Sequence, residues 1–187
     1  MRHRIFIASH LPNDVKKIFI DYQQRKLSNP CFRLVPEQAL HLTLIFIGYV
    51  SSDDLLKINQ VCQNVAYLFS PIEVKLNKIT FGPNSHSPRL IWAEGEISRD
   101  LDKLHKSLEN GLINKGINIK LENHLFKLHV TLTRFKNETN LPRLSKLEEK
   151  INKSFVINSI SVIESELNNT GPKYTDLATY TLKTNNN

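Results

Sequence analysis

Two short segments of the sequence carry residue types that acid–base chemistry needs. Residues 40–44 read Leu-His-Leu-Thr-Leu, and residues 128–132 read Leu-His-Val-Thr-Leu. Side chains alternate between the two faces of a β-strand, so each segment would direct a histidine and a threonine to one side and aliphatic residues to the other. Random order predicts only about 0.4 His-x-Thr triplets in this chain. A single copy would indicate a half-buried strand with a surface histidine, but two copies favour a shared polar site.

The residue types in these segments suit cleavage of a phosphorus–oxygen bond. Histidine exchanges a proton near neutral pH, and a pair of histidines could deprotonate a nucleophile and protonate a leaving oxygen. The hydroxyls of Thr43 and Thr131 can donate to phosphate oxygens. Arg134 follows the second segment, and its planar guanidinium fits phosphate, although a plain surface arginine is the alternative. The candidate site is therefore His41, Thr43, His129, Thr131 and Arg134.

The remaining histidines and the cysteines give weaker candidates. His105 falls on a predicted helix surface and His86 in a turn-rich loop. Cys31 and Cys62 form no C-x-x-C pair and no zinc-ligand spacing, so we expect no metal and no cofactor. Cys62 lies on the apolar stripe of a predicted helix and is expected to be a small core residue.

Composition narrows the class of protein. The chain has 187 residues, 40% hydrophobic and 23% charged, which is ordinary for a soluble globular protein. Its net charge of +7 favours anionic partners, although the scattered lysines also fit a plain basic surface. The apolar run at 5–8 is too short for a secretory signal, and no run approaches a membrane span. We expect a cytoplasmic protein with reduced thiols and no membrane partner.

The pattern of apolar and turn residues predicts alternating strands and helices, without a glycine-rich nucleotide loop. Proline suits the first turn of a helix, and serine suits the N-cap. We predict strands at 4–8, 32–35, 42–47, 72–80, 90–94, 117–121, 128–135, 155–166 and 174–182, helices that begin near Pro12, Ser51 and Ser98, and a short helix at 144–150.

The two histidine segments lie nearly half a chain apart, which suggests an internal duplication. We therefore expect two lobes, each with a sheet and helices, and each contributing one histidine strand to a shared cleft. No long linker separates them, so residues 1–183 are predicted to form a single domain. Residues 184–187 are predicted to be a disordered tail.

Residues along almost the whole chain match the pattern of one family. The matching residues are Phe6-Ile7-Ala8 with Leu11-Pro12, Arg33, Val35, the first segment with Phe46 and Gly48, Pro88-Arg89 with Trp92, the second segment with Arg134, and Ser165 with Gly171 to Leu182, including Tyr174. In these positions the chain resembles the two-histidine (2H) phosphoesterases, and among them the bacterial and archaeal RNA 2′,3′-cyclic phosphodiesterases, also called 2′-5′ RNA ligases. Many members carry proline before the second histidine, where this chain has Leu128.

The resemblance implies a bilobal α+β fold, with antiparallel sheets lining a central cleft and helices outside. It implies metal-independent hydrolysis of a 2′,3′-cyclic phosphate at an RNA end to a 2′-phosphate, with 2′-5′ ligation as a side reaction. His41 would be the proton donor, His129 the proton acceptor, and Thr43, Thr131 and Arg134 would bind the phosphate. We expect a monomer whose partner is RNA or an oligonucleotide with a cyclic phosphate end. An RNA-binding module without turnover, and a 2H enzyme for another small cyclic phosphate, are the alternatives.

Overall fold

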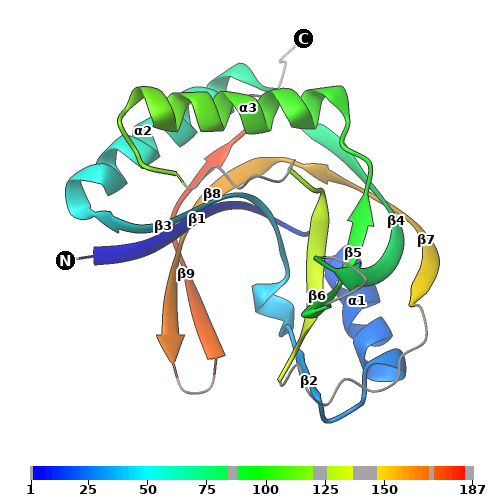
Figure 1. Ribbon diagram of the computed structural model, residues 1–187. Helices are drawn as coiled ribbons and strands as arrows, with labels where there is room; N and C mark the ends of the chain where they lie inside the picture. Colours follow the sequence, from blue (N-terminus) through cyan, green and yellow to red (C-terminus); the bar gives the residue numbers. More distant parts are fainter. Residues whose placement is uncertain (1, 84–87, 120–125, 137–146, 169–170, 184–187) are drawn as a thin grey trace.

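The computed structural model describes residues 2–83, 88–119, 126–136, 147–168 and 171–183. Two antiparallel sheets and three α-helices make up this part of the chain (Figure 1). The predicted tail at 184–187 lies outside the described residues. The elements are β1 (Arg2–His10), α1 (Asn13–Lys26), β2 (Phe32–Leu34), the short 3-10 helix η1 (Glu37–Ala39), β3 (His41–Ser51), α2 (Ser52–Leu68), β4 (Ile72–Gly82), β5 (Leu90–Gly95), α3 (Arg99–Asn114), β6 (His129–Phe135), β7 (Glu148–Ile157), β8 (Ser159–Asn168) and β9 (Gly171–Thr181).

The two sheets carry one histidine strand each, as the sequence predicts. Sheet A has the strand order β3-β1-β8-β9, and sheet B has the order β2-β6-β5-β4-β7. Strands β3 and β6 contact one another across the boundary between the sheets. This arrangement confirms the predicted α+β fold with two antiparallel lobes. The lobes are not the two halves of the chain, however, because sheet A takes strands from both ends and sheet B takes mainly the middle.

Side-chain alternation in β3 and β6 separates the core from the site. Leu42 and Leu44 in β3, and Val130 and Leu132 in β6, are buried in the main apolar core. The intervening histidines and threonines are only half-buried. Each strand therefore has one apolar face that anchors it and one polar face that is available for chemistry.

The helices lie on the outside of the two sheets (Figure 1). Helices α2 and α3 pack together over sheet A, and α1 packs against β6 of sheet B. The hydroxyl oxygens of Ser51 and Ser98 accept from the backbone N–H groups of Asp54 and Leu101, so both predicted caps are confirmed. Cys62 is fully buried, as predicted, and burial raises the pKa of its thiol to about 12.

Several predicted elements need correction. Strand β3 does not end at Gly48; it passes through this glycine with φ +94° and continues to Ser51. The predicted helix at 144–150 is wrong for residues 147–150, because β7 begins at Glu148 and pairs with β4. Residues 144–146 lie outside the described residues. β7 is an edge strand, and its charged residues lie on both of its faces: Glu148 and Lys150 are exposed, whereas Glu149 and Lys153 are half-buried. Polar and apolar residues therefore do not alternate at the start of this strand. The strand predicted at 155–166 is divided between β7 and β8. Of the strand predicted at 117–121, residues 117–119 are not a strand, and residues 120–121 lie outside the described residues.

Candidate active site

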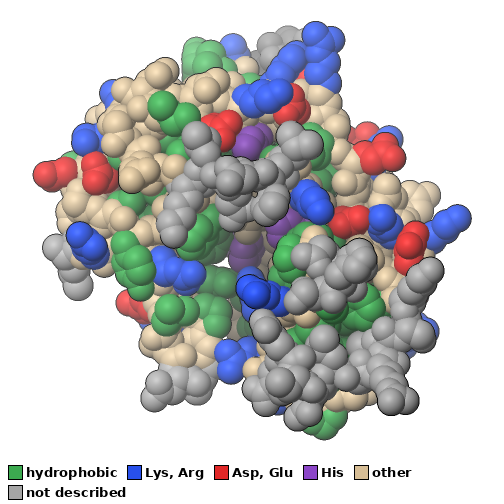
Figure 2. Space-filling view, in the orientation of Figure 1, with side chains coloured by type: hydrophobic (Ala, Val, Ile, Leu, Met, Phe, Trp, Pro, Cys, Tyr) green, Lys and Arg blue, Asp and Glu red, His purple; other side chains and the backbone are tan. Residues whose placement is uncertain are grey.

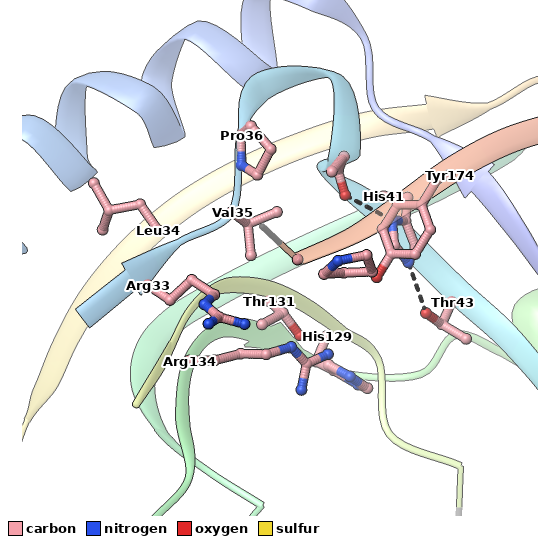
Figure 3. Close-up of a pocket in the computed structure, with 13 residues that line it drawn as sticks. Arg33, Leu34, Val35, Pro36, His41, Thr43, His129, Thr131, Arg134 and Tyr174 are labelled. Atoms are coloured by element: carbon pink, nitrogen blue, oxygen red, sulfur yellow. Dashed lines mark hydrogen bonds between the residues drawn. The ribbon is translucent and has the colours of Figure 1, made fainter. Parts of the chain in front are cut away.

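All five candidate residues line one cavity between the two sheets. His41 and Thr43 reach it from β3, and His129, Thr131 and Arg134 reach it from β6 (Figure 3). The cavity measures about 170 Å³, and the segment 33–36 and the start of β9 complete its wall. Figure 2 shows histidine side chains near the middle of this face of the molecule, with lysine and arginine side chains around them. The described part of the wall contains no aspartate, glutamate or cysteine.

His41 is held by hydrogen bonds at both of its ring nitrogens. Nδ1 lies 2.7 Å from the carbonyl oxygen of Ala39, which can only accept, so Nδ1 carries the hydrogen. In the neutral ring Nε2 then has the lone pair, and the hydroxyl of Thr43 donates to it at 3.1 Å. Ala39 ends the turn η1 two residues before His41 begins β3, so local backbone geometry orients the ring (Figure 3). The Nε2 atom is thereby presented to the cavity.

The surroundings of His41 favour its neutral form. Its pKa is lowered from 6.5 to about 4, and the largest cause is the loss of hydration on burial. The hydrogen bond to Ala39 acts in the opposite direction. Positive charge on His10, His129 and Arg134 lowers the pKa further. An anion in the cavity would offset this repulsion, so the protonation of His41 depends on what the cavity holds.

His129 is oriented by backbone and aromatic contacts. Its Nδ1 lies 2.9 Å from the carbonyl oxygen of Lys127 and must therefore donate. The ring centroid lies 4.4 Å from that of Trp92 in β5, an indole that is only 4% exposed. The ammonium group of Lys127 lies 5.8 Å from the same indole. Trp92 thus supports both side chains, and an aromatic face stabilises positive charge beside it.

A second arginine joins Arg134 at the cavity. Arg33 in β2 is the cross-strand partner of Arg134, and both side chains line the cavity (Figure 3). Within the described residues, neither guanidinium forms an ion pair with a carboxylate. Two cations in directly paired positions repel one another, so the pair favours an anion between or beside them. Arg33 matches the family pattern but is not one of the site residues predicted from the sequence. It lies eight residues before His41, outside both histidine segments, so its position in the sequence does not indicate a contact with phosphate.

Tyr174 of β9 closes the side of the cavity next to His41. Its ring centroid lies 5.3 Å from that of His41, at a nearly perpendicular angle. Phe6 of β1 contacts both rings, at 4.9 Å from His41 and 5.2 Å from Tyr174. These aromatic rings shield one side of His41 from water, which is consistent with its lowered pKa.

The other described histidines lie outside the cavity wall. His3 bonds to Glu164 at 2.7 Å, and His10, the cross-strand partner of His41, bonds to Asp176 at 2.8 Å. His105 on α3 stacks on Phe126. His86 falls outside the described residues. The described residues include no cluster of histidine, cysteine or acidic side chains able to hold a metal ion. None of their helices has the length and apolar character that crossing a bilayer needs.

Comparison with known proteins agrees with this architecture. The chain is 27% identical over 183 residues to an RNA 2′,3′-cyclic phosphodiesterase of Thermus thermophilus, covering 96% of this chain and 90% of the relative. It is 29% identical over 176 residues to one of Methanocaldococcus jannaschii, covering 91% and 96%. The crystal structure of TT0787 of Thermus thermophilus superposes with a TM-score of 0.85 at 26% identity, covering 96% of this chain and 97% of that one.

A more distant structure shares the fold. Escherichia coli LigT, solved as a complex with 3′-AMP, superposes with a TM-score of 0.80 at 22% identity, covering 98% of this chain and all of LigT. In this chain each of the two sheets contributes one strand with a His-x-Thr segment to the same cavity. This arrangement is that of the two-histidine phosphoesterases. The family model of the 2′-5′ RNA ligase superfamily matches residues 16–169. The chain belongs to this superfamily.

Proposed function

We propose that this protein hydrolyses a 2′,3′-cyclic phosphate at the end of an RNA strand and leaves a 2′-phosphate. One observation carries the proposal: two imidazoles from separate sheets, each committed through Nδ1 to a backbone carbonyl, line a single cavity. The same cavity contains two threonines and two arginines, which suit a phosphate. The names of the Thermus and Methanocaldococcus relatives support RNA as the substrate.

The proposed reaction is a displacement at phosphorus. Water attacks the phosphorus atom, and its proton passes to Nε2 of His129. The bond from phosphorus to O3′ breaks as Nε2 of His41 delivers a proton to O3′. The product has a phosphate on O2′ and a hydroxyl at C3′, and proton exchange with solvent restores both histidines. The direction of proton flow is taken from the family resemblance.

The phosphate-binding residues act on the charge of the transition state. Thr43 and Thr131 would donate to the non-bridging oxygens, and Arg134 would offset the developing negative charge. Arg33 would add a second guanidinium on the same side. If a 5′-hydroxyl replaced water as the nucleophile, the product would be a 2′-5′ phosphodiester, which is the ligation that the superfamily name describes.

The test is to incubate the protein with RNA that ends in a 2′,3′-cyclic phosphate and to identify the product isomer by ³¹P NMR. We expect the 2′-phosphate, at a rate that EDTA changes by less than a factor of about two. Formation of the 3′-phosphate would contradict the proposed scissile bond. Tight binding without turnover would favour an RNA-binding module. Much faster turnover of a small cyclic phosphate than of RNA would favour the other alternative.

A further inference from the structure

The face of sheet A that presents His41 continues beyond the cavity. Directly paired residues of antiparallel strands point to the same side, so the register of β1 and β3 defines this face. His10 pairs with His41, Ala8 with Thr43, Phe6 with Phe46, and Arg4 with Tyr49. The far end of the face is open to solvent, because Phe46 is 40% exposed and Tyr49 is 64% exposed. We call Arg4, Phe46 and Tyr49 the aromatic platform.

Arg4 supplies a positive charge at the centre of the platform. Its Nη1 donates to the buried hydroxyl of Ser165 at 3.0 Å, and its Cζ lies 5.1 Å from the centroid of the Phe46 ring. The neighbouring carboxylate of Glu164 is bonded to His3 instead. In the described part of the chain, Arg4 has no ion-pair partner. A guanidinium that is fixed in place and has no carboxylate partner can bind a phosphate.

The platform lies too far from the histidines to contact the reacting phosphate. Phe46 lies five positions after His41 along β3, which corresponds to at most about 16 Å between their Cα atoms at the usual rise. The cavity of about 170 Å³ is also smaller than the roughly 300–1,000 Å³ of pockets that enclose a whole small molecule. It therefore has room for the end of a polymer, whereas the preceding residues of that polymer must lie outside it.

Single-stranded RNA is the ligand that these features fit. Its bases stack on exposed aromatic rings, and its phosphates pair with arginine. We propose that the aromatic platform is a second binding subsite, which takes the unpaired nucleotides preceding the terminal phosphate. Bases would stack on Phe46 and Tyr49, and a backbone phosphate would lie at Arg4. The proposal rests on the proposed function for the identity of the polymer, and the charge of +7 is favourable to it.

The experiment compares two substrates that differ only in the polymer. Cytidine 2′,3′-cyclic phosphate places one nucleotide at the cavity and has no preceding nucleotides to reach the platform, whereas a short single-stranded RNA with the same end would also use the platform. The variants are Phe46→Ala and Tyr49→Ala, singly and together. Tyr67→Ala is the matched control, because Tyr67 is an exposed aromatic on α2 with the ammonium of Lys183 at 5.2 Å from its ring. Thermal melts verify that each variant is folded.

For each variant, the measured quantity is kcat/KM for the RNA divided by kcat/KM for the mononucleotide. We expect this ratio to fall by about tenfold in the double variant, as loss of a stacked base implies, and not in the control. Arg4→Gln should also reduce the slope of log affinity against log salt concentration by about 0.7, the contribution of one phosphate contact to a single strand. Unchanged ratios in folded platform variants would overturn the proposal.

Failure of the proposed function can be distinguished from failure of the platform. If neither substrate is hydrolysed, fluorescence anisotropy with a labelled RNA ending in a 3′-phosphate replaces the rate measurement. Weaker RNA binding by the platform variants, relative to Tyr67→Ala, would still support the subsite. Equal binding would overturn it. A dimer in sedimentation that the platform variants dissociate without loss of RNA binding would overturn it too, and would assign the surface to a second copy of the chain.

Discussion

His41 and His129 are oriented by the same contact in two different sheets. In each ring Nδ1 donates to the carbonyl oxygen of the residue two positions earlier, at 2.7 Å for His41 and 2.9 Å for His129. A carbonyl in this position fixes the tautomer of the neutral ring and leaves Nε2 for chemistry. The repeat in the sequence is therefore also a repeat in local geometry, and it gives the cavity two imidazoles held by the same kind of contact.

Removal of either imidazole should abolish most of the proposed activity. We expect His41→Ala and His129→Ala each to lower kcat for a 2′,3′-cyclic phosphate by about 10²- to 10⁴-fold, the usual contribution of general acid–base catalysis. His105→Ala is the control, because His105 stacks on Phe126 away from the cavity. Full activity of either folded active-site variant would contradict the mechanism.

Binding of an anion should protonate His41. In the free protein its pKa is about 4, so the ring is neutral at pH 7 and resembles a base more than an acid. For His41 to donate a proton at neutral pH, the negative charge of the bound phosphate must raise this pKa against the loss of hydration on burial and the positive charges of His10, His129 and Arg134. We expect ¹⁵N NMR of the imidazole to show uptake of a proton at Nε2 when a 3′-nucleotide binds. A ring that stays neutral in the complex would reverse the roles of the two histidines.

The lowered pKa of His41 also predicts how stability depends on pH. Between pH 6.5 and 4 the unfolded chain binds a proton at this residue and the folded chain does not, so the folded state loses stability as the pH falls. The loss attributable to His41 is at most about 3 kcal/mol. Denaturant unfolding at several pH values should show this component in the wild type and not in His41→Gln. Equal pH dependence of the two proteins would refute the shift.

Arg33 and Arg134 should contribute to binding at the expense of stability. We expect Arg33→Gln to raise KM for the cyclic phosphate about tenfold, because a hydrogen bond to a charged group is lost. The free energy of unfolding should stay level or rise by a few tenths of a kcal/mol, since the repulsion between paired cations is removed. Arg25→Gln, in an exposed ion pair on α1, is the control and should leave KM unaltered. A large loss of stability in Arg33→Gln would indicate a structural role instead.

A buried glutamine links β6 to the residue that follows β2. Gln23 of α1 is 2% exposed, and its Nε2 donates to the carbonyl oxygens of Val35 at 2.9 Å and Leu132 at 2.7 Å. We expect Gln23→Leu to lower the free energy of unfolding by about 1–3 kcal/mol, because buried carbonyls lose a donor. Gln24→Leu, at the exposed neighbouring position, should cost little. Urea denaturation of both variants decides whether this contact holds the cavity wall together.

Prediction from the sequence succeeded where the residues of a single strand or helix were enough to indicate its structure. Alternation in residues 40–44 and 128–132 was enough to separate buried leucines from the polar face. The capping serines at 51 and 98 were also local signals. Prediction failed at Glu148, because edge strands tolerate charged residues, and it failed at Gly48, because a positive φ can occur inside a strand as well as at its end.

Local sequence determined which residues could act as proton-transfer groups and on which face of its strand each one lies. Only the tertiary structure decided which groups meet. Sheet register brings Arg33 beside Arg134, β9 brings Tyr174 to His41, and β5 brings Trp92 to His129. These contacts join segments that are distant in the chain, and no periodicity within a segment encodes its partner. The pKa of His41 belongs to the second group as well, because burial and neighbouring charge exist only in the folded protein.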